Sequence, residues 1–183
     1  MKLMPNLIAF SFSLNTGVIT DIILSMDDKF LYFSNWIQGD IRQYNVTDPS
    51  KPILVSAVVA GGSLCNDSRI EILREDNEDK SQDNLVARPK VKGKPLRGGP
   101  QMLQLSLDGR RLYVTNSLYS TWDAQFYPDL AEHGSMMVKI DVDHEKGGMA
   151  MNGDFLVDFG EDCAMLAHEM RYPGGDCTSD IWC

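Results

Sequence analysis

The sequence lacks any apolar run long enough to cross a membrane as a helix. No window approaches the ~18 consecutive apolar residues that a span requires. The apolar N-terminal run from Leu7 to Leu14 is interrupted by serines and has no small-residue cleavage pattern, so it is a poor signal peptide. We therefore expect no transmembrane span and a cytosolic location, with the nucleus or peripheral contact with a membrane as alternatives.

Positive charge is also scarce. The chain has 17 Lys and Arg against 26 Asp and Glu, which gives a net charge of −9. Such a chain repels a phosphate backbone rather than neutralising it, so nucleic acid is not an expected partner. The glycine-rich phrase Gly98-Gly99-Pro100 lacks the following helix N-terminus that a phosphate-cradling loop needs, which argues against nucleotide binding.

Cysteines are few and have no Cys-x-x-Cys spacing. The four are Cys65, Cys163, Cys177 and Cys183, so neither a zinc knuckle nor a thioredoxin-type pair is indicated. In a reducing cytosol they should be free thiols. Three of them lie near the end of the chain, where they are either ordinary loop thiols or ligands for a soft ion such as selenium, cadmium or copper.

The residues that are present indicate short strands joined by turns. At 183 residues and 43% hydrophobic, the chain can bury one core as one domain or two small ones. Strands are predicted at Ile22–Leu24, Phe30–Ser34, Ile41–Val46 and Ile53–Ala60. In the third strand, Arg42 and Tyr44 should share one face. Four such strands within about 45 residues match the length of one propeller blade.

This unit recurs along the chain. Leu24, Ser25, Asp27, Leu31, Tyr32 and Asn35 recur at a constant offset as Leu105, Ser106, Asp108, Leu112, Tyr113 and Asn116. The Asp should bond the backbone of its turn, while the Leu and the aromatic residue should bury between adjacent sheets. The second copy continues through Met137–Val142 and Phe155–Phe159. Repetition favours an all-β fold, a partial β-propeller of the WD40-like, seven-bladed type, over a sandwich.

A charged insertion separates the two copies. Its first half is acidic and its second half is basic. A helix around Ile70–Glu75 is one reading, but an exposed excursion is expected, which either solvates and balances charge or binds a partner. The expected division is a divergent segment at 1–17 and the C-terminal part of a propeller at 18–183. That part comprises a blade at 18–62, the insertion at 63–98, and a second blade with a closing segment at 99–183.

A second insertion, inside the second copy, is rich in aromatic residues. Tyr119 to Leu130 contains four aromatics in twelve residues. Long insertions on a propeller usually lie on one face, where function collects. The rings either wall a pocket for a small thiol or thioether, because sulfur packs well against ring edges, or cap the core. His133 and His144, beside acidic neighbours, should be surface histidines.

The C-terminal stretch from Leu166 to Cys183 concentrates polar chemistry. In the simpler interpretation it is a closing strand and turn, with Pro173 and two glycines setting the backbone. In the alternative, His168 is a metal ligand or an acid/base group, with Arg171 and Asp176 as its supporting residues. Both interpretations follow from the residues alone.

Four phrases of the sequence resemble the selenium-binding protein family, whose members include methanethiol oxidases. They are Ser34-Asn35-Trp36 with Gly39-Asp40, Gly98 to Met102, Tyr119 to Pro128, and His168 to Trp182. The resemblance covers roughly residues 18 to 183. It begins abruptly near Val18, which suggests an altered or truncated start, and Cys163 departs from the family pattern.

The resemblance implies a β-propeller, cytosolic or loosely membrane-associated, that binds selenium. It also implies oxidation of methanethiol by oxygen to formaldehyde, hydrogen sulfide and hydrogen peroxide, with copper in at least some members. Of the family's histidines only His168 carries over, as a catalytic or metal-binding residue supported by Asp176 and Arg171. A copper centre would need two or more further ligands.

Two other functions remain open at this point. The chain is either a non-catalytic binder of selenium or soft metals through Cys163, Cys177 and Cys183, or a truncated interaction module. A chain with two clear blades leaves sheet edges and apolar faces without a neighbour. We therefore expect self-association, and weak or no oxidase activity from the chain by itself.

Overall fold

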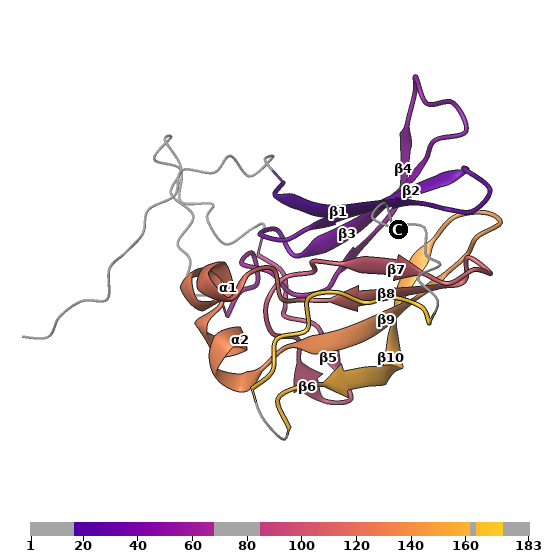
Figure 1. Ribbon diagram of the computed structural model, residues 1–183. Helices are drawn as coiled ribbons and strands as arrows, with labels where there is room; N and C mark the ends of the chain where they lie inside the picture. The colour runs from indigo at the N-terminus through magenta and orange to yellow at the C-terminus, as the bar shows by residue number, and fades with distance from the viewer. Residues whose placement is uncertain (1–16, 68–84, 162–163, 174–183) are drawn as a thin grey trace, which may run out of the picture.

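The computed structural model describes residues 17–67, 85–161 and 164–173, and most of the regular structure in them is antiparallel sheet (Figure 1). Sheet 1 has the strand order β1-β2-β3-β4 and sheet 2 the order β10-β9-β8-β7. Sheet 1 consists of β1 (Ile19–Leu24), β2 (Phe30–Asn35), β3 (Asp40–Asn45) and β4 (Ile53–Val59). Sheet 2 consists of β7 (Leu103–Leu105), β8 (Arg111–Thr115), β9 (Met136–Val142) and β10 (Met149–Asp158).

Three smaller parts connect and flank the sheets. A hairpin of β5 (Lys90–Val91) and β6 (Lys94–Pro95) precedes sheet 2. The aromatic insertion forms α1 (Ser120–Phe126) and α2 (Pro128–His133), for which the sequence had named no element. The helix considered at Ile70–Glu75 lies outside the described residues.

The all-β prediction is confirmed, and each predicted strand is present. Each sheet is an up-and-down meander of four strands in chain order, which is the blade-type unit of propeller folds. In β3, Ile41 and Gln43 are buried while Arg42 and Tyr44 lie on the opposite face, as their alternation predicts.

The repeated turn has the same hydrogen bonds in both copies. Ser25 Oγ donates to Asp27 Oδ1 at 2.6 Å and accepts the backbone N–H of Phe30 at 2.9 Å. Ser106 Oγ donates to Asp108 Oδ1 at 2.5 Å and accepts the backbone N–H of Arg111 at 3.0 Å. The aspartates also accept backbone N–H groups of the turn, as expected. The shared phrase therefore encodes one turn, used twice.

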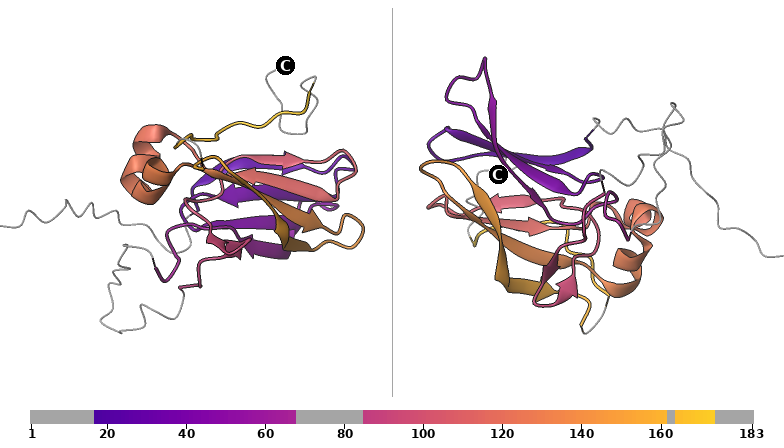
Figure 2. Two further views of the ribbon diagram at one scale, coloured as in Figure 1. Left: turned by 90° about the horizontal axis from the view of Figure 1, so that it is seen from below. Right: turned by 180° about the vertical axis from the view of Figure 1, so that it is seen from behind.

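The main core lies between the two sheets, which pack face to face (Figure 2). Sheet 1 contributes Ile23, Phe30, Tyr32 and Ile41, and sheet 2 contributes Leu103, Leu105, Leu112, Val114, Val138, Ile140 and Val142. Neighbouring residues of a strand point to opposite faces, so only one of each Leu-Tyr pair faces the other sheet. In sheet 1 this is Tyr32, and in sheet 2 it is Leu112.

Hydrogen bonds join the sheets at both edges. At the β1–β7 edge, Asp21 Oδ2 accepts the backbone N–H of Leu103 at 2.6 Å, and Ser34 Oγ donates to the Gln101 carbonyl at 2.6 Å. At the β4–β10 edge, the N–H of Met149 donates to Ser56 Oγ at 3.1 Å. The first strand of sheet 1, β1, therefore lies beside the first strand of sheet 2, β7. The last strands, β4 and β10, also lie side by side, as in radially repeated sheets.

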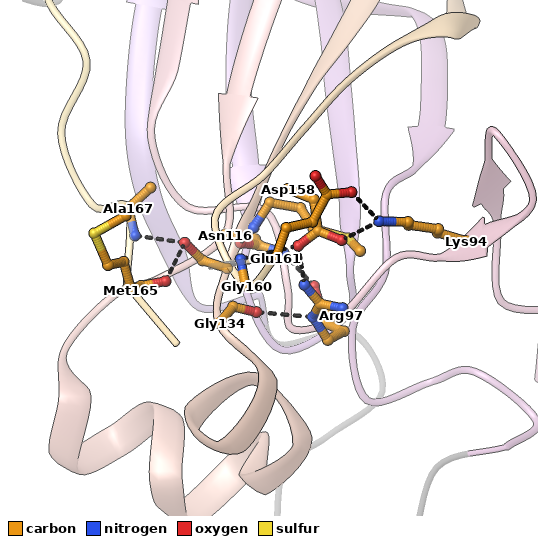
Figure 3. A network of polar contacts seen from close by, with 11 residues as sticks. Lys94, Arg97, Asn116, Gly134, Asp158, Gly160, Glu161, Met165 and Ala167 are labelled. Carbon is orange, nitrogen blue, oxygen red and sulfur yellow. Dashed lines mark hydrogen bonds and ion pairs between the residues drawn. The ribbon is translucent and has the colours of Figure 1, made fainter. Parts of the chain in front are cut away.

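The described part of the charged insertion is tied to sheet 2 by ion pairs (Figure 3). Lys94 Nζ lies 2.8 Å from Asp158 Oδ2 and 2.6 Å from Glu161 Oε1. Arg97 donates to Asp158 Oδ1 at 2.5 Å and to the Gly134 carbonyl at 2.8 Å. The insertion therefore docks onto the end of β10 through both of these cations.

Candidate functional site

The site is built on the segment 164–173, which we name the closing segment. It runs beside sheet 2 (Figure 2) and is bonded to β8. Thr115 Oγ1 donates to the carbonyl of His168 at 2.8 Å. The N–H of Ala167 donates to Ser135 Oγ at 2.5 Å, and the N–H of Ser135 donates to the Met165 carbonyl at 2.9 Å (Figure 3). These bonds fix the backbone at and before His168.

The imidazole of His168 has one nitrogen committed to the protein. Its Nδ1 lies 3.0 Å from the backbone carbonyl oxygen of Ser117. A carbonyl oxygen can only accept, so Nδ1 carries a hydrogen, and in the neutral imidazole Nε2 then carries the lone pair. The residue is exposed, and its ring stacks on Tyr119 with centroids 5.9 Å apart. This tautomer suits a metal ligand or a proton acceptor, because such histidines typically donate the other N–H to a fixed oxygen.

A buried carboxylate holds the residue that orients His168. Ser117 Oγ donates to Asp123 Oδ2 at 2.6 Å, and the N–H of Leu118 donates to Asp123 Oδ1 at 3.1 Å. Asp123 has an exposed fraction of 0%. Burial raises the pKa of Asp123, and the bonds from Ser117 and Leu118, with the charge of His168, oppose that rise only in part. Asp123 thus fixes the Ser117 backbone that binds His168.

A second, half-buried carboxylate, Asp21 on β1, lies within electrostatic range of the same imidazole. Burial raises the pKa of Asp21, while backbone bonds from Leu103 and Ile22 and the charge of His168 lower it. Asp21 lies on β1 and Asp123 on α1, and both carboxylates are within electrostatic range of the one histidine.

The aromatic insertion has a buried side and an exposed side. Tyr127 and Leu130 pack with Trp36 in a second core cluster, and burial raises the pKa of the Tyr127 hydroxyl. Tyr119 and Trp122 remain 63% and 48% exposed. The insertion therefore seals one end of the core and also presents two rings at the surface, one of them stacked on His168.

The remaining predicted site residues are not brought to His168 by the described structure. Arg171 Nε donates to Glu169 Oε1 at 2.5 Å. Asp176, Cys163, Cys177 and Cys183 lie outside the described residues. Cys65 is buried and donates its thiol to the Gly61 carbonyl at 3.1 Å, and burial raises its pKa, which makes it a poor nucleophile.

Metal-ligating side chains are sparse in the described structure. Within residues 17–67, 85–161 and 164–173, no three His, Cys, Asp or Glu side chains gather in a metal-binding arrangement. His133 is exposed on α2 and His144 lies in the β9–β10 turn, so neither joins His168. In the same ranges, none of the helices has the length and apolarity to cross a bilayer.

Sequence reasoning missed Ser117, Asp123 and Asp21 as parts of this site. Asp123 had a usable signal, because a carboxylate between Trp122 and Phe126 in an aromatic stretch is often buried and therefore needs donors. Asp21 had no such signal in the sequence, since its contact with the Leu103 backbone depends on how β1 packs beside β7.

Two four-stranded antiparallel sheets of the blade type place the chain among the all-β, propeller-type proteins. The family model described as 56kDa selenium binding protein (SBP56) matches residues 2–183. The chain therefore belongs to the SBP56 selenium-binding protein family.

Named relatives agree with this assignment. The chain is 58% identical over 168 residues to a methanethiol oxidase of Xenopus tropicalis, covering 91% of this chain and 35% of that protein. It is 57% identical to selenium-binding protein 1 of Arabidopsis thaliana, covering 91% of this chain and 34% of that protein. It is also similar to the crystal structure of a hypothetical selenium-binding protein from Sulfolobus tokodaii, with a TM-score of 0.68, 41% identity, and 91% and 31% of the two chains covered. The chain thus spans about a third of the length of these relatives.

Proposed function

We propose that this chain carries part of a methanethiol oxidase site, centred on His168. The reaction converts methanethiol, oxygen and water to formaldehyde, hydrogen sulfide and hydrogen peroxide. The proposal is supported by identities near 58% to relatives named methanethiol oxidase. Its single structural support is the His168 imidazole, whose Nδ1 binds the Ser117 carbonyl and whose Nε2 lone pair is left for chemistry.

In this proposal His168 Nε2 accepts the thiol proton of methanethiol. Loss of that proton gives a thiolate, which is the more readily oxidised and more nucleophilic form of sulfur. The imidazolium that results lies within electrostatic range of the carboxylates of Asp21 and Asp123. Tyr119 and Trp122 would supply ring edges against which the methyl and sulfur groups pack.

Copper, implied for some members by the resemblance, needs several imidazole or thiolate ligands at fixed geometry. The described residues gather no such set, so they do not by themselves fit a copper ion. The role proposed here for His168 is proton transfer, and its role as a metal ligand stays a prediction. Selenium binding through Cys163, Cys177 or Cys183 stays a prediction, since it rests on the family name and on residues that the structure does not describe.

A chimera tests the proposal, because the chain covers 35% of its Xenopus tropicalis relative. This chain would replace the matching part of that methanethiol oxidase, and hydrogen sulfide and hydrogen peroxide would be measured together. We expect both products from the chimera. We expect His168→Gln to lower the rate by about 10²-fold or more, the usual contribution of a proton-transfer residue.

His144→Gln is the matched control, since it removes a histidine from a surface turn of the same sheet. Its rate should stay close to that of the parent chimera. A chimera that releases neither product, or a His168→Gln chimera as active as its parent, would contradict the proposed function.

A further inference from the structure

An asparagine–glycine pair lies where the pairing of β10 with β9 is broken. The chain contains one such pair, Asn152-Gly153. The register of the two strands shifts between Met151 and Leu156, so residues 152–155 of β10 lie opposite Lys139 alone. β10 is also an edge strand of sheet 2. The backbone of the pair is therefore not held in a regular ladder, as in other bulged segments of edge strands.

Gly153 supplies an accessible backbone nitrogen next to the Asn152 carboxamide. The nitrogen that follows an asparagine can attack the side-chain carbon Cγ and close a succinimide ring, and a side chain on the second residue hinders this approach. Gly153 has no side chain and is exposed. A Cβ placed on it would have nothing within 4 Å apart from its chain neighbours. The space around the attacking nitrogen is therefore open.

Hydrogen bonds hold the Asn152 carboxamide in position for this attack. Its Oδ1 accepts the backbone N–H of Asp154 at 3.1 Å, which turns the side chain back along its own backbone. Its Nδ2 donates to Asp141 Oδ2 at 2.6 Å. Attack at Cγ places negative charge on Oδ1, where the Asp154 N–H stabilises it as a donor in an oxyanion hole does. The arrangement therefore lowers the barrier to ring closure.

We propose that Asn152 is a site of spontaneous deamidation in the folded protein, with water as the only co-reactant. The Gly153 nitrogen gives up its proton and forms a bond to Asn152 Cγ. The Cγ–Nδ2 bond breaks, and Nδ2 takes up a proton and leaves as ammonia. Water then opens the succinimide at one of its two carbonyl carbons. Opening at Cγ leaves an aspartate, and opening at the Asn152 backbone carbon leaves an isoaspartate, in which the main chain runs through the former side chain.

The aspartate product places a second negative charge beside Asp141. The Asn152 Nδ2 donor is replaced by a carboxylate oxygen, and like charges on neighbouring strands repel. Lys139 Nζ, 3.4 Å from Asp141 Oδ1, offsets this repulsion only in part. Asn152→Asp should therefore unfold at a lower denaturant concentration than the wild type, and Asp141→Asn in the same chain should remove most of that difference. An Asn152→Asp chain as stable as the wild type would contradict this consequence.

Peptide mapping of the full 183-residue chain tests the site. After incubation in mildly alkaline buffer at physiological temperature, tryptic peptides are separated and analysed by mass spectrometry. Asn152 should be converted progressively to aspartate and isoaspartate. Asn116 is the matched internal control, because it is 6% exposed, its Oδ1 accepts the Met136 N–H at 2.8 Å and its Nδ2 donates to the Arg97 carbonyl. It should keep its amide throughout.

Two variants test the proposed route at Asn152. Gly153→Ala should slow the loss of the amide because its Cβ hinders the attack. Asp154→Pro should slow it because proline removes the N–H that binds Oδ1. A synthetic peptide of residues 149–155, incubated in parallel, shows that the buffer and the time suffice for the reaction. A folded chain that keeps its Asn152 amide while the peptide reacts, equal loss at Asn116 and Asn152, or a loss that neither variant slows would overturn the proposal.

Discussion

Replacing Trp36 by alanine is expected to destabilise the fold by about 3–5 kcal/mol, the range for a large aromatic lost from a core. Trp36 follows β2 directly and has an exposed fraction of 0%. Its ring meets Phe126 and Tyr127 edge-on at 5.3 and 5.0 Å. Its carbonyl accepts the Tyr127 hydroxyl at 2.6 Å. The residue therefore joins the end of sheet 1 to the aromatic insertion.

Trp122→Ala is the matched control for this prediction. Trp122 belongs to the same aromatic group, 6.2 Å from Trp36 by centroids, but is 48% exposed. Its loss should cost roughly 1 kcal/mol, since less apolar area returns to water. Chemical denaturation followed by circular dichroism measures both variants. Equal losses for the two tryptophans would contradict the central position assigned to Trp36.

The second large effect is expected at Asp158, whose side chain is 7% exposed and contacts both Arg97 and Lys94. Asp158→Asn removes the charge and leaves Arg97, itself only 19% exposed, without its carboxylate. We expect a loss of about 2–3 kcal/mol, less than for a fully buried pair because Lys94 is 41% exposed. Asp141→Asn removes the partner of Lys139 from a pair whose carboxylate is 51% exposed, and it should cost under about 1 kcal/mol.

The ion pairs of Asp158 with Lys94 and Arg97 also predict how the stability of the fold depends on pH. Burial alone would raise the pKa of Asp158, but hydrogen bonds from Lys94, Gly160 and Arg97 outweigh it and hold that pKa below its usual value. A lowered folded-state pKa stabilises the protein above the unfolded pKa of about 4 and is lost as the pH falls further. Asp158→Asn should therefore flatten the decline in stability below about pH 4. If Asp158→Asn left the fall in stability at acid pH unchanged, the contribution assigned to the Asp158 carboxylate would be contradicted.

Local patterns made the strands and their turns predictable. Each Ser-x-Asp turn is closed by bonds within five residues, so its structure is written in the sequence at one place. Alternation placed Arg42 and Tyr44 on one face for the same reason. Strand order then followed, because short turns join consecutive antiparallel strands.

Features that depend on distant contacts were not predictable in this way. Arg97 and Asp158 lie far apart in the chain, and only the packing of the β5–β6 hairpin against β10 brings them together. The site shows the same division. His168 was singled out from its local motif, but the Ser117 carbonyl and the Asp123 carboxylate that orient it come from the end of β8 and from α1. α1 and α2 themselves are short, and their aromatic residues carry no clear helical period.

Nitrogen NMR of the 183-residue chain with labelled histidine tests the central claim most directly. If the closing segment holds His168 as described, mildly alkaline buffer should show one histidine locked with hydrogen on Nδ1 and a lone pair on Nε2. Its signals should vanish in His168→Gln and persist in His144→Gln. A His168 spectrum with hydrogen on Nε2, or one averaged over both tautomers like a free side chain, would contradict the account.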